Sequence, residues 1–339
     1  MSLKIGPYQL PSRLLLAPMA GITDRPYRDM CRHYGAGLTV SEMLTSDPSL
    51  LYSRKTQLRL VQEDEPLPRS AQIVGTEPDI MARAAQFNIE NGANIIDINM
   101  GCPAKKVCNK AAGSALMRDT DLVKRILSSI VNAVDAPVTL KIRTGWATSN
   151  KNAVKIAKIA EDQGVSCLSV HGRSRSQAFT GFSEYETIRQ IKQVINIPVI
   201  ANGDIKNIKD AQFIFNYTSV DGLMLGRITH GQPWIFKEIN DRLSHERTDH
   251  FISNTLPASP TDNISIQEKI ETTLNHINAI HRYYGTDQGV RIARKHIGWY
   301  LYNLVGHDLI LLKKLKKKLF TIADASQQLK QLDDALRQL

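Results

Sequence analysis

Eight short apolar segments recur through the first 230 residues of the chain. They are LLLAPMA (14–20), LTVSEM (38–43), SAQIVG (70–75), IIDINMG (95–101), PVTLKIR (137–143), CLSVHGR (167–173), PVIANGD (198–204) and GLMLGR (222–227). Their starts lie roughly 24 to 42 residues apart, which is the length of a strand–helix unit. Segments that are apolar at nearly every position are typical of strands buried on both faces of a parallel sheet.

Amphipathic segments with helix signals lie between these strands. Residues 78–92 begin with proline and end with Asn-Gly, and residues 119–134 open with acidic residues that suit a helix N-terminus. Eight such units predict a closed (β/α)8 TIM barrel, an α/β fold. A doubly wound sheet is the alternative, but no G-x-G-x-x-G follows the first strand.

The composition changes after the eighth unit. Residues 244–265 are polar, include two prolines and are interpreted as a linker between a barrel domain (1–243) and a C-terminal domain (266–339). Four helical patterns follow, at 266–284, 289–304, 309–320 and 325–338, with Gly285, Gly289 and Gly306 as expected stops. Helices of this length with short connections predict a small all-α helical bundle.

Composition and charge narrow the class of protein. With 42% hydrophobic and 22% charged residues in 339, the chain can bury a large core. Its four cysteines form no C-x-x-C pair and no zinc-type cluster with histidine, and no apolar stretch approaches 18 residues. No secretory leader is recognisable at the N-terminus. We therefore expect a cytoplasmic protein with no bound metal and no membrane association.

The net charge of +10 is concentrated near the C-terminus. Residues 291–318 hold eight lysines and arginines against one acid, Asp308. Arg291, Arg294 and Lys295 are spaced to share one helix face. An ordinary solvated basic surface is one reading, but a local excess favours a polyanionic partner such as nucleic acid.

Polar or otherwise unusual residues occur at the ends of all eight predicted strands. They are Pro18-Met19-Ala20, Glu42, Gln72, Asn99, Lys141, Arg143, His171, Asn202-Gly203-Asp204 and Gly226-Arg227. In a barrel these positions converge on the C-terminal rim, where function collects. Cys102, held between glycine and proline after the fourth strand, could act there as a nucleophile or a proton donor, or could be a packed thiol. The glycines after strands seven and eight, with Arg227, suggest a ligand that bears phosphate.

Several motifs together resemble the tRNA-dihydrouridine synthase family, and most closely its bacterial B subgroup. They are APMAGITDRPYR (17–28), SEM (41–43), Gln72, DINMGCPAKKV (97–107), GSALM (113–117), LKIRTGW (140–146), HGR (171–173), ANGDI (201–205), GRITHGQPWIF (226–236) and RIARKH (291–296). They cover essentially the whole chain. The resemblance implies an FMN-binding TIM barrel followed by a helical tRNA-binding domain.

The resemblance also implies roles for individual residues. FMN would be held by Pro18, Met19, Ala20, Gln72, Lys141, His171, Asn202, Gly203, Asp204, Gly226 and Arg227. Asn99 would hold the target uracil, and Cys102 would be the proton donor. The implied reaction is reduction of the C5–C6 bond of a D-loop uridine in tRNA, with NADPH (or NADH) as reductant, hydride from flavin N5 to C6, and a proton from Cys102 to C5.

Further residues are expected to contact tRNA. Lys105 and Lys106, beside Cys102, would grip phosphates near the flipped base, with Arg143 at the same rim and Arg291, Arg294 and Lys295 in the tail. Cys108 has no assigned role and is either a packed or surface thiol or a redox partner of Cys102. No obligatory protein partner is evident. A flavin reductase of small pyrimidines or quinols, and an RNA-binding protein with an inactive barrel, are the alternative functions.

Overall fold

The structure, a computed structural model, describes residues 2–248, 264–306 and 308–339. Contacts divide the chain into two compact units. The first comprises Met1–Arg28 and Gly35–Gly226, and the second comprises Asp29–Tyr34 and Arg227–Leu339. Each unit is described by itself.

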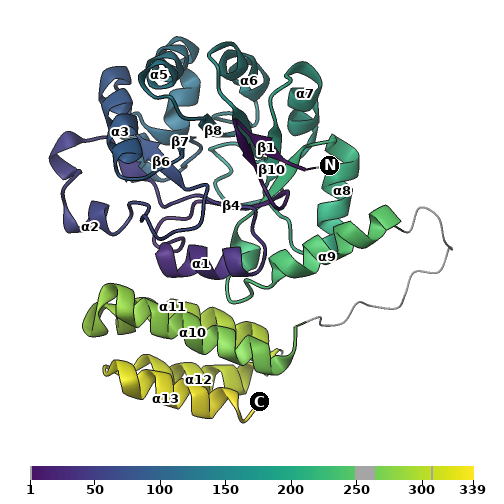
Figure 1. Ribbon diagram of the computed structural model, residues 1–339. Helices are drawn as coiled ribbons and strands as arrows, with labels where there is room; N and C mark the ends of the chain where they lie inside the picture. The colour runs from purple at the N-terminus through teal and green to yellow at the C-terminus, as the bar shows by residue number, and fades with distance from the viewer. Residues whose placement is uncertain (1, 249–263, 307) are drawn as a thin grey trace. The chain divides into compact units, whose positions relative to one another are not determined.

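The first unit is built around parallel strands that close into a barrel (Figure 1). They are β3 (Leu14–Leu16), β4 (Leu38–Thr39), β5 (Leu44–Thr45), β6 (Ser70–Val74), β7 (Ile95–Met100), β8 (Val138–Arg143), β9 (Cys167–His171), β10 (Val199–Asn202) and β11 (Gly222–Leu225). Their order in the sheet is β4-β3-β11-β10-β9-β8-β7-β6-β5. β4 lies within the predicted second strand (38–43) and β5 directly follows that segment, so the two take one place in the ring, and the predicted eight-stranded barrel is confirmed.

Two contacts join the ends of this sheet. Val40, which follows β4, forms a parallel bridge with Ser70 at the start of β6. The backbone N–H of Ser41 donates to the carbonyl oxygen of Ser70 at 3.0 Å. The ring of strands is therefore closed. Because the strands are parallel, their carboxyl ends all lie on one rim.

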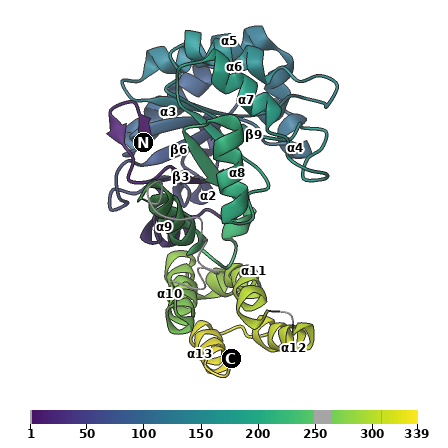
Figure 2. The ribbon, with the colours of Figure 1, turned by 90° about the vertical axis from the view of Figure 1, so that its right-hand side faces the viewer.

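Helices surround the barrel on its outer side (Figures 1 and 2). They are α2 (Arg54–Gln57), α3 (Pro78–Glu90), α4 (Lys105–Cys108), α5 (Thr120–Ala133), α6 (Ala153–Asp162), α7 (Glu186–Val194) and α8 (Ile208–Thr218), with α1 (Arg25–His33) divided between the two units. The helices predicted at 78–92 and 119–134 are confirmed. α3 has Pro78 in its first turn, and Asp119 caps α5 by accepting from the N–H groups of Asp121 and Leu122.

An N-terminal hairpin that the sequence pattern did not predict covers the amino end of the barrel. It consists of β1 (Lys4–Ile5) and β2 (Tyr8–Gln9). Leu3 and Ile5 are buried in one cluster with Ile95 and Cys167, the first residues of β7 and β9. Apolar side chains therefore fill this end of the barrel, and the polar groups lie in the layers above it.

Besides Asp29–Tyr34, the second unit contains a 3-10 helix (Arg227–Thr229), α9 (Ile235–Thr248) and four further helices. These are α10 (Ile266–Tyr284), α11 (Thr286–Val305), α12 (Leu309–Phe320) and α13 (Ala325–Leu336), shown in Figure 2. Their buried apolar side chains form one core. The predicted all-α bundle is confirmed. Gly285 and Gly306 adopt positive φ angles of 80° and 68° at helix ends, as expected of stops.

Gly289 was expected to stop a helix, and this prediction is wrong. It lies in the first turns of α11, where a Cβ atom would come within 2.7 Å of the Cα of His281 in α10. Glycine is used here because two helix backbones approach closely, so its role is packing.

The domain boundaries expected from the sequence remain predictions. Helix α9 runs to Thr248, past the expected end of the barrel domain at residue 243, and the contact-based boundary falls earlier, at Arg227. The expected linker, 244–265, lies mostly outside the described residues. No helix in the described parts of the chain has the length and apolar character needed to cross a membrane.

Candidate functional site

Cys102 lies in a loop that hydrogen bonds hold from two sides. The Oδ1 atom of Asn99, the last residue but one of β7, accepts from the N–H groups of Gly101 (3.1 Å) and Cys102 (2.9 Å). The carbonyl oxygen of Cys102 accepts from the Ser114 hydroxyl at 2.8 Å. The residue remains partly exposed at the rim. The backbone of Cys102 is thus fixed, and the residue is open to a ligand at the rim.

The same loop is tied to its neighbours by Arg143 at the end of β8. Its Nε donates to the carbonyl oxygen of Gly101 at 2.8 Å, and its Nη1 donates to the carbonyl oxygens of Ser174 (3.0 Å) and Ala178 (2.9 Å). The side chain is buried. The structure therefore uses Arg143 to join two rim loops, and its expected contact with tRNA stays a prediction.

Below the loop, a buried set of polar groups crosses three strands. Asp97 Oδ1 accepts from the Thr139 hydroxyl at 2.6 Å, and Asp97 Oδ2 accepts from Gln72 Nε2 at 2.7 Å. Gln72 Oε1 in turn accepts from Asn99 Nδ2 at 2.8 Å. Burial raises the pKa of Asp97 to about 6, although both hydrogen bonds and Lys141 favour its charged form.

Lys141 extends this set toward β10. Its Nζ donates to Asn202 Oδ1 at 3.1 Å, and Asn202 Nδ2 donates to the carbonyl oxygen of Met224 at 2.7 Å. Burial, and secondarily the positive charge of Arg143, lower the pKa of Lys141 to about 8. His171 ends β9 in register with Arg143 and Asn202. The structure thus gathers Gln72, Asn99 and Lys141 with the ends of β9 and β10, as the sequence predicted.

The turn after β10 is held by its own side chains. Asp204 Oδ2 accepts from Arg173 Nη2 and from the backbone N–H of Ser183, each at 2.7 Å. Gly203 has a φ of 115°, and a Cβ atom there would lie 2.3 Å from the Ser183 hydroxyl. Close packing of the protein therefore already requires Gly203. At Gly226 a Cβ would make only ordinary 3.8 Å contacts, to atoms of Ala17 and Met19, so packing alone does not require glycine there.

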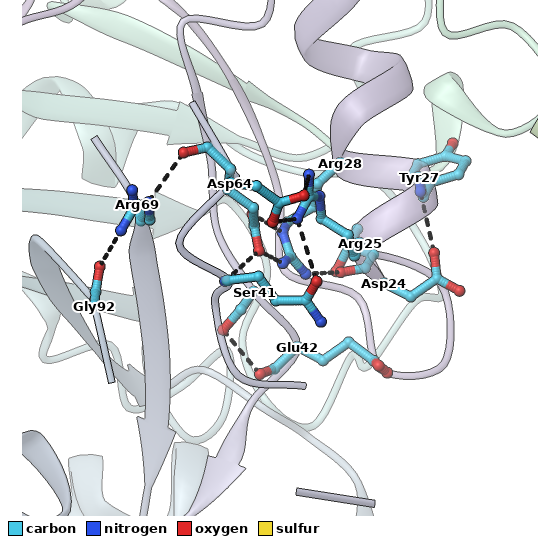
Figure 3. Close-up of polar contacts among 12 residues, drawn as sticks. Asp24, Arg25, Tyr27, Arg28, Ser41, Glu42, Asp64, Arg69 and Gly92 are labelled. Atoms are coloured by element: carbon cyan, nitrogen blue, oxygen red, sulfur yellow. Dashed lines mark hydrogen bonds and ion pairs between the residues drawn. The ribbon is translucent and has the colours of Figure 1, made fainter. Parts of the chain in front are cut away.

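The loop that contains Pro18, Met19 and Ala20 is held by a buried acid. Glu42 accepts a hydrogen bond from the backbone N–H of Gly21 and forms a 3.4 Å ion pair with Arg59. Figure 3 shows Glu42 and Ser41 near the base of α1. Two further pairs, Arg25 with Asp64 and the buried Arg28 with Glu65, fix the start of α1 to the segment that precedes β6.

All four cysteines are unpaired thiols. Burial raises the pKa of the Cys102 thiol, opposed by a hydrogen bond from the Ala104 N–H, so the thiol is protonated at neutral pH. Cys108 lies against the same loop, with its Sγ 3.5 Å from both the Cys102 carbonyl oxygen and the Ser114 hydroxyl. It is partly exposed at the end of α4, and its thiol is free of any disulfide.

The basic residues expected to contact tRNA belong to both units. Lys105 and Lys106 are exposed on α4 of the barrel. In the helical unit Arg291 is exposed, whereas Arg294 is half-buried and donates to the carbonyl oxygen of Ile322 at 3.2 Å. Lys295 is half-buried on α11. Arg227, which was expected to hold FMN, is exposed in the 3-10 helix Arg227–Thr229. In α12, Lys313, Lys314, Lys317 and Lys318 are exposed and Leu312 and Leu319 are buried. Leu309 and Ile310 in the first turn are exposed as well, so the exposed side of the helix is basic with an apolar start.

The structure adds roles for three further residues of the site. Asp97 and Thr139 belong to the buried polar set, and Glu42 had been noted only as a polar residue at a strand end. A signal for Asp97 was present, because it is an acid within an otherwise apolar strand, two positions before Asn99. Residues two apart in a strand face the same side. No local pattern identifies Thr139.

A closed barrel with a thiol, a buried lysine and several amides at its C-terminal rim defines a (β/α)8-barrel enzyme. The sequence profile described as "Dihydrouridine synthase (Dus)" matches residues 15–339. The chain therefore belongs to the dihydrouridine synthase family.

Three proteins that are similar to this chain share one name. "tRNA-dihydrouridine synthase B" of Pseudomonas aeruginosa is 55% identical over 305 residues, covering 89% of this chain and 88% of that protein. The proteins of the same description from Vibrio parahaemolyticus (52%, covering 88% and 89%) and Salmonella typhimurium (50%, covering 98% of both) are also similar. A solved variant of NCR from Zymomonas mobilis is 16% identical, with a TM-score of 0.49 over 71% of this chain and 90% of its own, too weak a likeness to inform function.

Proposed function

We propose that the protein is a tRNA-dihydrouridine synthase that reduces the C5–C6 bond of a specific D-loop uridine, with FMN as cofactor and NADPH as reductant. In support, relatives named "tRNA-dihydrouridine synthase B" match this chain over 88% to 98% of their own length. The observation that carries the proposal is the protonated, partly exposed Cys102 on a loop fixed above Gln72, Asn99 and Lys141. This arrangement supplies an acid beside groups suited to a polar heterocycle.

The chemistry of the rim fits a flavin. Lys141 would stabilise negative charge at the pyrimidine edge of the ring, and the Gln72 amide can face its carbonyl and N–H groups. The close approach that Gly226 leaves open suits a bulky ligand beside Met19. The remaining expected contacts are Pro18, Ala20, His171, Asn202, Gly203, Asp204 and Arg227. FMN, once reduced by NADPH, would supply the hydride for C6.

Cys102 would complete the reduction by donating the thiol proton to C5. Hydride and proton then add across the double bond, and the thiol is recovered by taking a proton from solvent. The raised pKa of Cys102 suits this role, since an acid must hold its proton until the base is in place. Asn99 would face the uracil with the second N–H of its side-chain amide, because its first N–H donates to Gln72 and its Oδ1 accepts from the loop.

Basic residues would hold the tRNA. A uridine must leave its stack to reach a barrel rim, and Lys105 and Lys106, exposed on α4 just after Cys102, would contact the flanking phosphates. Arg291, Arg294 and Lys295 on α11 would supply further phosphate contacts. A substrate of this kind and four unpaired thiols both suit the reducing cytoplasm.

The test compares two cysteine variants of the full chain. Purified protein should show flavin absorbance, oxidise NADPH and form dihydrouridine in tRNA from cells that lack the enzyme. Cys102→Ala should still bind flavin and accept electrons from NADPH, but lose at least about 10²-fold in base reduction. Cys108→Ala, the matched control, should retain base reduction. Absence of flavin, or normal turnover by Cys102→Ala, would refute the proposal.

A further inference from the structure

Asp97 carries a buried carboxyl group that has no role in the proposed reaction. Its exposed fraction is 2%, and it lies on β7 with its side chain on the same face as Asn99. Burial of a carboxyl group in a barrel interior is unfavourable unless hydrogen bonds compensate. Such a residue needs a reason beyond packing.

A series of hydrogen bonds links Cys102 to Asp97 through Asn99 and Gln72, and each bond is donated toward Asp97. An ionised carboxylate only accepts, so Gln72 must turn its amide nitrogen toward Asp97, at 2.7 Å. The Gln72 oxygen then faces the other way and accepts from Asn99 Nδ2 at 2.8 Å. Asn99 is thereby oriented as well, with its oxygen toward the N–H groups of Gly101 and Cys102 at 3.1 and 2.9 Å.

The opposite orientation of these amides would place donors against donors. If Gln72 turned its oxygen toward Asp97, two acceptors would face each other, and its nitrogen would meet the nitrogen of Asn99. Asn99 would then have to turn its own nitrogen toward the N–H of Cys102. Each such buried mismatch is unfavourable, so one carboxylate selects a single arrangement of two amides and one loop.

We propose that Asp97 is a positioning residue for the proton donor, setting the orientation of Gln72 and Asn99 and through them the backbone of Cys102. This inference rests on the proposed function for its meaning in catalysis. Its structural part, the control of the loop by Asp97, does not depend on that function and can be measured without turnover.

The experiment uses the full chain saturated with FMN and two readouts. The first is hydrogen–deuterium exchange of the Gly101 and Cys102 amides, and the second is base reduction in a single turnover by pre-reduced enzyme. Asp97→Asn can present either an oxygen or a nitrogen to Gln72, so the direction is lost. We expect amide exchange at the loop to rise about 10-fold, and base reduction to slow by about 10- to 10²-fold, with flavin reduction by NADPH little changed.

Two companion variants separate positioning from general damage. Thr139→Val removes the other hydrogen bond to Asp97 but leaves the line to Cys102, and should leave the loop amides protected. In the double variant Asp97→Asn with Gln72→Glu, the new carboxylate can accept both from the new amide at 97 and from Asn99, so protection of the loop should return.

Three results would overturn the inference: unchanged exchange in Asp97→Asn, an equal rise in Thr139→Val, or no return of protection in the double variant. A wild-type protein that fails to reduce tRNA would instead refute the proposed function, while the exchange measurement would still test the control of the loop.

Discussion

Replacement of Arg143 by methionine tests whether this arginine serves mainly to hold the rim together. The change keeps an unbranched side chain and removes three charge-assisted hydrogen bonds, to the carbonyl oxygens of Gly101, Ser174 and Ala178. Each hydrogen bond to a charged group contributes about 1.5–3 kcal/mol. Removing the guanidinium also relieves the unfavourable burial of a charge, which is shown by its pKa, lowered to about 10 by desolvation.

We therefore expect Arg143→Met to lower the free energy of unfolding of the barrel by about 2–4 kcal/mol, less than the sum of the three bonds. For a unit of this size, that corresponds to a fall in Tm of about 5–15 °C. Calorimetry would measure the change in Tm, and hydrogen–deuterium exchange should show faster exchange in the two loops that Arg143 joins.

Lys105→Met is the matched control, because it removes an exposed charge beside the same loop and should change stability by less than about 0.5 kcal/mol. If Arg143→Met leaves Tm and loop exchange as in the wild type but lowers the slope of log tRNA affinity against log salt by about 0.7–0.9, the reasoning is wrong. Arg143 would then act on RNA phosphate.

Three further predictions concern other parts of the chain. Gly289→Ala should lower the free energy of unfolding of the helical unit by about 1–3 kcal/mol, and its Tm with it, because the added Cβ would meet the Cα of His281 at 2.7 Å. Thermal unfolding with an unchanged midpoint would contradict this. Base reduction should decline as pH rises through about 8, where Lys141 loses its proton, while the Cys102 thiol titrates above its ordinary pKa of 9.0; a single-turnover pH profile flat up to pH 9 would exclude Lys141. Arg291→Glu should weaken tRNA binding and flatten its salt dependence without loss of flavin, and it is a cleaner test than Arg294, which bonds within the protein; unchanged affinity would remove this helix face from the interface.

Much of the architecture follows from local pattern. The spacing of eight apolar segments predicts the barrel because strands buried on both faces must be apolar almost throughout, and each needs a helix to return the chain. The helix starts at Pro78 and Asp119 could be predicted because capping depends on a few neighbouring residues. The N-terminal hairpin was missed because its strands are two residues long, too short for periodicity to register.

The role of Gly289 illustrates where local pattern misleads. Glycine usually ends a helix because it tolerates positive φ, and Gly285 and Gly306 behave in this way. At Gly289 the deciding factor is instead the close passage of another helix, α10, which no neighbouring residue in the sequence reveals.

By itself, the sequence determined the fold class, the family likeness and the set of strand ends at which Gln72, Asn99, Cys102 and Lys141 occur, because these depend on periodicity and short motifs. Only the tertiary structure decided what those side chains bind. Hydrogen-bond direction depends on partners 25 to 61 residues away in the chain, as between Gln72 and Asp97 or Lys141 and Asn202. Closure of the barrel brings such residues to bonding distance, and so makes Asp97, an ordinary acid in the sequence, part of the structure that holds Cys102.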